Sequence, residues 1–266
     1  MPKIAISGKG GVGKTTLAGL LAYIYASQGK KVLAIDADPD ANLASALGFP
    51  QEKVANLTPI AEMQELITER TGAQPGGYGV FFKLNPRVDD IPDRFCVTHR
   101  RIKLLLMGTV KQGGGGCVCP ESVLLKSLVR HLLVERDEVV IMDMEAGIEH
   151  LGRATADSVD ALIIVVEPGQ RSLQTARLVK NLASDIGLSR LYIVGNKVRN
   201  EEDRRFIAEG LEGFQILGFL SASPKAIEAD LKGLTLFDLD EKIVEEARPI
   251  AAALENGTLI NTDFPH

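Results

Sequence analysis

The chain has 266 residues, 45% of them hydrophobic, and a formal net charge of −5. This length and composition suffice for a substantial core, and we expect one domain over residues 1–266. The 30 Lys and Arg residues form no long basic block, so we expect no nucleic-acid partner. No signal region precedes the first apolar run, and no run approaches the roughly 20 residues of a membrane helix. We therefore expect a cytoplasmic protein without stable membrane association.

A glycine-rich loop follows the first apolar run of the chain. Residues 3–7 lead into the sequence GKGGVGKTT at 8–16, and a helix-like segment follows at 17–27. Glycines allow several backbone N–H groups to converge on one anion, and the helix N-terminus adds its positive end. The pattern G-x-x-x-x-G-K-[ST] predicts that Lys14 reaches the β- and γ-phosphates of a nucleotide and that Thr15 holds Mg²⁺. The predicted phosphate-binding residues are Gly10, Gly11, Val12, Gly13, Lys14, Thr15 and Thr16.

Apolar strands and helical segments alternate along the rest of the chain. The predicted strands are 31–39, 102–107, 139–142, 161–166, 191–195 and 214–220. The predicted helices are 122–135, 172–186, 201–209 and 240–254. This alternation predicts an α/β fold with a mostly parallel, twisted sheet, helices on both faces and ligands at the carboxyl ends of the strands. An irregular insert at about 58–99 receives no functional prediction.

The loop carries a second lysine, Lys9, directly after its first glycine. The sequence K-G-G-V-G-K-T resembles the deviant Walker A motif of a P-loop ATPase family, which includes the nitrogenase iron protein, septum-site and plasmid-partition ATPases and metallocentre maturation ATPases. The resemblance implies ATP hydrolysis by a homodimer in which the catalytic Lys9 crosses to the partner's nucleotide. A solvated loop lysine is the alternative.

Two strand ends carry candidate catalytic carboxylates, because phosphoryl transfer requires a positioned water and cations around the moving charge. Asp38, before Pro39, resembles the aspartate of the family's first switch, which orients the attacking water. Asn42 lies where the family has a polar residue that senses the γ-phosphate. The sequence VIMD at 140–143 resembles Walker B, which implies that Asp143 holds Mg²⁺. Gly147, in the segment that resembles the second switch, would donate its N–H to the γ-phosphate.

Other polar residues near these strand ends have open interpretations. Aspartates after strands often cap helices, and for Asp36 and Glu149 capping is as well supported as a functional role. Solvated or supporting positions are favoured for Glu145 and His150. Asn196 and Lys197 resemble the family's base-reading position, where an asparagine amide pairs with adenine. ATP is favoured over GTP because Lys197 is followed by VR rather than by the x-D of a guanine site.

Three cysteines are too few for a disulfide framework, which leaves free thiols or metal ligands. Cys117 and Cys119 lie two residues apart, after four glycines and before a helix. One such pair does not close a four-ligand shell, but a two-fold dimer would bring two pairs together around Zn²⁺, Ni²⁺ or an iron–sulfur cluster. The helix start should lower the thiol pKa. Packed apolar thiols are the alternative, and Cys96 is a possible additional ligand.

The Cys-x-Cys-Pro sequence and the sequence DMEAGIEH at 143–150 resemble CooC-type maturation ATPases of carbon monoxide dehydrogenase, or their relatives for acetyl-CoA synthase. The resemblance implies a nickel metallochaperone that uses ATP, ADP and Mg²⁺, binds Ni²⁺ or Zn²⁺ at Cys117 and Cys119 across a dimer, and has a nickel enzyme as client. A positioning ATPase would have a basic amphipathic tail, whereas residues 250–266 contain no Lys or Arg. An iron–sulfur redox ATPase would have two well-separated cysteines per subunit.

Overall fold

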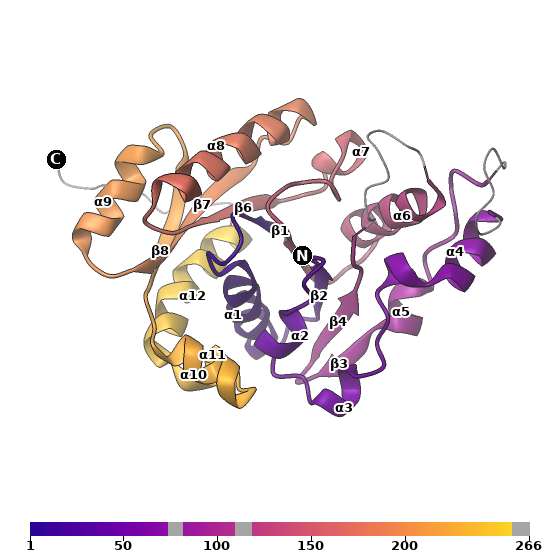
Figure 1. The fold of residues 1–266 in the computed structure, drawn as a ribbon, viewed down its shortest axis with the longest axis horizontal. Helices are drawn as coiled ribbons and strands as arrows, with labels where there is room; N and C mark the ends of the chain where they lie inside the picture. Colours follow the sequence, from indigo (N-terminus) through magenta and orange to yellow (C-terminus); the bar gives the residue numbers. More distant parts are fainter. Residues whose placement is uncertain (74–81, 110–118, 257–266) are drawn as a thin grey trace.

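The computed structural model describes residues 1–73, 82–109 and 119–256. These residues form an eight-stranded sheet with the strand order β3-β4-β2-β5-β1-β6-β7-β8 (Figure 1). All neighbouring strands are parallel except β3 and β4, which are antiparallel. The strands are β1 (Lys3–Ser7), β2 (Val32–Ala37), β3 (Val97–His99), β4 (Ile102–Leu106), β5 (Val139–Met144), β6 (Ala161–Val166), β7 (Leu191–Val198) and β8 (Gln215–Ser221). The predicted α/β fold with a mostly parallel sheet is confirmed.

Helices cover both faces of this sheet. Helices α4 (Gln64–Thr71), α5 (Ile91–Phe95), α6 (Pro120–Val134), α7 (Arg153–Ala156), α8 (Gln170–Asp185) and α9 (Glu201–Gly210) contribute to one hydrophobic core. Helices α1 (Lys14–Ser27), α2 (Leu43–Ala46), α11 (Leu236–Leu239) and α12 (Glu241–Asn256) contribute to the core on the other face. The remaining helices are α3 (Gln51–Val54), the 3-10 helix η1 (Ile60–Glu62) and α10 (Lys225–Lys232). None of the helices in the described ranges is long and apolar enough to cross a membrane.

Strand β5 shows why the sequence forms a buried central strand. Val140 and Met142 point into the core that contains α6, whereas Val139 and Ile141 point into the core that contains α1. Successive side chains of a strand alternate between faces, and both faces here are covered, so the strand is a continuous apolar run. The run ends at Asp143, which therefore lies at the carboxyl edge of the sheet.

The insert at 58–99 is more ordered than the sequence suggested over the part that the structure describes. It contains η1, α4, α5 and β3, and it contributes Ile60, Leu66, Ile67 and Ile91 to the core beside α6. These elements have three to eight residues each, which is too short for a clear helical period. The insert thus extends one hydrophobic core and the antiparallel edge of the sheet.

The central parallel strands bring three polar residues to one edge. Asp143 on β5 is in register with Ile6 on β1 and with Asp36 on β2. Ser7, which follows Ile6, ends β1 and leads into the glycine-rich loop. Because neighbouring strands end together, residues that are more than 100 positions apart in the sequence share one small region at the start of α1.

Candidate functional site

The glycine-rich loop makes a tight connection between β1 and α1. Gly13 caps α1 with a φ of 97°, a left-handed conformation that favours glycine. A Cβ at Gly13 would clash with the Asn196 side chain, and a Cβ at Gly8 would clash with the carbonyl oxygen of Val165. Glycine is therefore required at these two positions by the close approach of β6 and β7. The loop leaves the N-terminus of α1 open towards a cavity.

Asp143, which is buried, and Thr15 form a part-buried polar contact at the start of α1. The Thr15 hydroxyl donates a hydrogen bond of 2.6 Å to Oδ2 of Asp143. Oδ1 of Asp143 is buried and has no hydrogen-bond partner among the described residues. Burial raises the pKa of Asp143 to about 7. A carboxylate oxygen without a partner beside a hydroxyl is a donor set that fits Mg²⁺, which prefers oxygen ligands.

Asp36, on the neighbouring strand, has its carboxylate occupied by the backbone. Oδ2 accepts a hydrogen bond of 2.9 Å from the N–H of Leu43, and Oδ1 accepts one of 3.3 Å from the N–H of Asp38. Burial raises its pKa to about 6. Asp36 therefore holds the turn that follows β2 and the start of α2. The structure favours this supporting role for Asp36, which the sequence left open.

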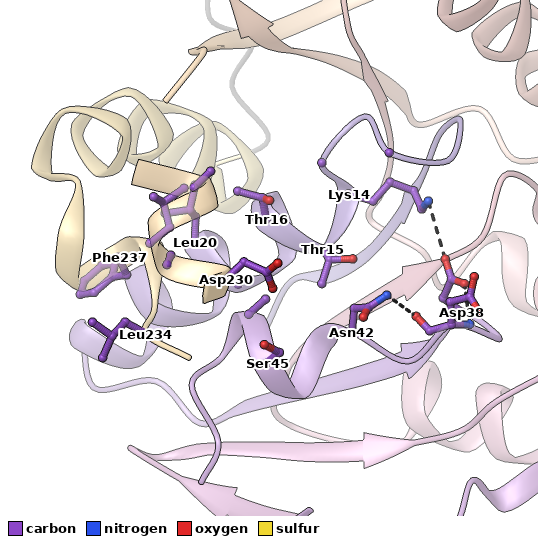
Figure 2. Close-up of a pocket in the computed structure, with 18 of the residues that line it drawn as sticks. Lys14, Thr15, Thr16, Leu20, Asp38, Asn42, Ser45, Asp230, Leu234 and Phe237 are labelled. Atoms are coloured by element: carbon purple, nitrogen blue, oxygen red, sulfur yellow. Dashed lines mark hydrogen bonds and ion pairs between the residues drawn. The ribbon is translucent and has the colours of Figure 1, made fainter. Parts of the chain in front are cut away.

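Asp38 lies opposite the glycine-rich loop. Its Oδ2 is 3.7 Å from the ammonium of Lys14, and its Oδ1 accepts a hydrogen bond from the N–H of Asp40 (Figure 2). Asn42 donates from its amide to the carbonyl of Asp40, which closes the same turn. Lys14 is buried, so its charge acts in a region with little water screening. The structure thus brings the predicted Lys14, Thr15, Asp38 and Asp143 together.

The segment after β5 packs under the glycine-rich loop. The Ser7 hydroxyl hydrogen-bonds to the carbonyl oxygens of Glu145 and Gly147 at 3.1 and 2.9 Å. The N–H of Gly147 donates to the carbonyl of Glu145. Burial, followed by the charges of Glu149 and Asp38, raises the pKa of Glu145. His150 is buried rather than solvated, and its Nε2 lies 3.0 Å from the carbonyl oxygen of Ala37.

Asn196, Lys197 and Lys9 meet around the other side of the loop. The Asn196 amide is buried and donates to the carbonyl of Val12 at 2.8 Å. Asn196 therefore supports the loop, and its predicted contact with adenine stays a prediction. Lys197 contacts the carbonyl of Gly11 and lies 3.2 Å from the carboxylate of Glu167. Lys9 is 3.9 Å from the same carboxylate, so Glu167 lies between two lysines.

The cavity at the start of α1 has a volume of about 540 Å³, which lies within the range of ligand pockets. It extends from the glycine-rich loop between α2 and α10 to α11. Figure 2 shows Asp230, Leu234 and Phe237 from this region opposite Thr16 and Leu20. The sequence did not predict the contribution of α10 and α11, because short helices carry little periodic signal. Their contact with α1 also joins segments that lie far apart in the chain.

The cysteines differ from expectation in one respect. Cys119 caps α6, and its sulfur accepts a hydrogen bond of 3.4 Å from the N–H of Ser122. Burial nevertheless raises the pKa of Cys119, although that N–H opposes the shift, so the expected lowering by the helix start is wrong for this thiol. Cys117 lies outside the described residues.

Metal ligands do not cluster within a single copy of the described part of the chain. Burial raises the pKa of Cys96 to about 12, and Cys96 packs against the core beside α6. In the described ranges, no group of three or more His, Cys, Asp and Glu side chains is arranged to hold a metal ion.

Known proteins that are similar to this chain include nucleotide-binding proteins and a protein of similar fold. The family described as the CobQ/CobB/MinD/ParA nucleotide binding domain matches residues 3–236. The carbon monoxide dehydrogenase accessory protein CooC of Rhodospirillum rubrum is 51% identical over 95% of both chains. An ATP-binding protein of Methanocaldococcus jannaschii is 47% identical over 93% of this chain and 95% of its own. The MinC:MinD cell division complex of Aquifex aeolicus contains a chain of similar fold, with a TM-score of 0.70, 22% identity and 98% of both chains covered.

Because burial disfavours the charged form of Asp143, we expect the Asp143→Asn variant to differ from the wild type in stability. A carboxyl whose pKa is raised in the folded state adds stability below its unfolded pKa and loses it as pH rises through the folded pKa. The wild type should therefore lose stability relative to the variant between about pH 4 and pH 7. At pH 8 the variant should be more stable by roughly 2 to 4 kcal/mol, since one pKa unit corresponds to about 1.4 kcal/mol.

Urea unfolding without added nucleotide or Mg²⁺, measured at several pH values, checks this expectation. The exposed Asp137→Asn, just before β5, is the matched control and should change little. Equal stability of the wild type and Asp143→Asn across this pH range would contradict the assigned burial cost. The same variant should lose Mg²⁺-dependent ATP hydrolysis.

Proposed function

The chain belongs to the CobQ/CobB/MinD/ParA nucleotide-binding family and is an ATPase, and from this premise we propose that it is a nickel metallochaperone. It would use ATP hydrolysis to deliver nickel into carbon monoxide dehydrogenase or the related acetyl-CoA synthase. The observation that carries this proposal is the 51% identity to the carbon monoxide dehydrogenase accessory protein CooC over 95% of both chains. Identity at this level over nearly the whole chain supports a shared function for the two proteins.

The residues at the carboxyl edge of the sheet support roles in ATP hydrolysis. Gly10 to Gly13, Lys14, Thr15 and Thr16 would bind the phosphates, and Thr15 and Asp143 would hold Mg²⁺. When bound, Mg²⁺ supplies positive charge to the phosphate oxygens. Asp38 would orient the attacking water, because its carboxylate lies on the cavity side of Lys14. The amide of Asn196 and the ammonium of Lys197 would contribute to the nucleotide site from β7.

A homodimer is part of this proposal. Lys9 is partly exposed and makes only a loose contact of 3.9 Å with Glu167, which supports its turning to a nucleotide held by a second copy. An ammonium that arrives from the partner would stabilise the charge that develops during phosphoryl transfer. Hydrolysis would then depend on dimer formation.

The metal is the cargo and would be held by Cys117 and Cys119 from both copies. Four thiolates on a two-fold axis suit Zn²⁺ or Ni²⁺. The raised pKa of Cys119 means that metal binding must displace a proton from this thiol. Helix α6 starts directly after Cys119 and is followed by β5, which contains Asp143 and leads into the second switch segment. This short connection supports a coupling between nucleotide state and metal release.

The two lysines of the loop should give different defects. Lys14→Ala should weaken ATP binding by roughly 10-fold to 100-fold, because a hydrogen bond to a charged group contributes about 1.5–3 kcal/mol. Lys9→Ala should bind ATP within about threefold of the wild type but lose hydrolysis and ATP-dependent dimer formation. Equilibrium binding of a fluorescent ATP analogue, phosphate release and light scattering separate these defects. Wild-type hydrolysis by Lys9→Ala would contradict the proposed role in the partner's site.

The metal site should depend on two of the three cysteines. Anaerobically purified, reduced protein should bind about one Ni²⁺ or Zn²⁺ per two chains. Cys117→Ser and Cys119→Ser should each lose this metal, whereas Cys96→Ser should keep it and serve as the matched control. Metal analysis of the mass-separated dimer gives the stoichiometry. Retention of metal in both Cys117→Ser and Cys119→Ser would refute the assignment, and a brown protein would indicate an iron–sulfur cluster instead.

A further inference from the structure

His150 connects the two segments that follow β2 and β5. It lies after the predicted second switch and before α7, and its Nε2 is 3.0 Å from the carbonyl oxygen of Ala37 at the end of β2. Only 9% of the residue is exposed, although it is titratable. Neither phosphate binding nor the proposed catalytic roles account for this contact.

The chemistry of the contact fixes the direction of the hydrogen bond. A carbonyl oxygen only accepts hydrogen bonds, so Nε2 carries the proton and donates it. Burial lowers the pKa of His150, although the Ala37 carbonyl and Glu149 oppose the shift, which favours the neutral ring with a proton on Nε2. The ring therefore donates a hydrogen bond from the segment after β5 to the end of β2.

The hydrogen bond from His150 matters for catalysis because of where Ala37 lies in the chain. Ala37 directly precedes Asp38, whose carboxylate faces Lys14. Asp36, on the other side of Ala37, is held by its own hydrogen bonds to the backbone of Asp38 and Leu43. The pairing of β2 with β5 runs to Ala37 and Met144, and the His150 bond adds a side-chain link from this strand end to the segment after β5. A small displacement of a catalytic group lowers the rate strongly, since catalysis depends on orientation.

We infer that His150 is a positioning residue for ATP hydrolysis, which holds the end of β2, and with it Asp38, in place relative to the second switch segment. The inference rests on the proposed role of Asp38. His150 does not line the cavity at the start of α1, so it would act through the backbone of Ala37. It also makes the position of each switch segment depend on the other, so that a shift of one is transmitted to its neighbour.

Two variants of similar size separate the hydrogen bond from simple packing. His150→Met fills the space without a donor, whereas His150→Gln offers an amide N–H. We expect His150→Met to lower kcat for ATP hydrolysis roughly tenfold with a KM for ATP within about twofold, and His150→Gln to recover most of kcat. His131→Gln is the matched control, because His131 is equally buried but hydrogen-bonds to Glu135, the residue directly after α6. It should leave kcat unchanged.

Phosphate release at varied ATP concentration gives kcat and KM, and binding of a fluorescent ATP analogue shows that each variant is folded. An unchanged kcat in His150→Met, or an equal loss in the Met and Gln variants, would overturn the inference. Asp38→Asn in the same assay tests the proposal beneath it. If Asp38→Asn keeps wild-type kcat, the role of Asp38 is wrong; if it loses kcat while His150→Met does not, only the positioning role fails.

Discussion

The buried carboxylates at the carboxyl edge of the sheet are the constraint on which the site depends. Asp36 and Asp143 occupy neighbouring strands in register, where burial raises the pKa of both. Both carboxylate oxygens of Asp36 accept hydrogen bonds from backbone N–H groups. Among the described residues, the carboxylate of Asp143 accepts a hydrogen bond only from the Thr15 hydroxyl. A buried charge is costly without a partner, so this edge favours a cation, and it places that cation beside the loop that would bind phosphate.

The sequence predicted most of the sheet and its long helices, because buried parallel strands are continuous apolar runs. The strand predicted at 161–166 has those bounds in β6, and the helix predicted at 172–186 differs from α8 by one or two residues. The short elements of the insert were not predicted. Their residues enter the core through contacts with α6, and such contacts leave no periodic pattern in three to eight residues. That the chain forms a single domain stays a prediction.

In the candidate site, too, the sequence predicted some residues and contacts and left others unpredicted. Lys14, Thr15, Asp38 and Asp143 were found because motifs with fixed local spacing place them at strand ends. The support of the loop by Asn196, the position of Glu167 between Lys9 and Lys197, and the contact of His150 with Ala37 all join distant segments. The prediction for Cys119 failed in its pKa, since the effect of burial exceeded that of the helix start. Local pattern gives the residue types, and tertiary packing decides what they contact.

The fold itself does not distinguish a metallochaperone from a positioning ATPase, because a MinD cell division protein has a similar fold. In the proposed function, bound nucleotide and bound metal change each other's affinity, and coupling of this kind is reciprocal. The most direct test is the ATP affinity of the dimer with and without bound Ni²⁺ or Zn²⁺. If the two sites are coupled, metal should change the Kd for ATP at least about fivefold, and ATP should change the Kd for metal by the same factor. Equal ATP affinities of the metal-loaded and metal-free protein would contradict this coupling.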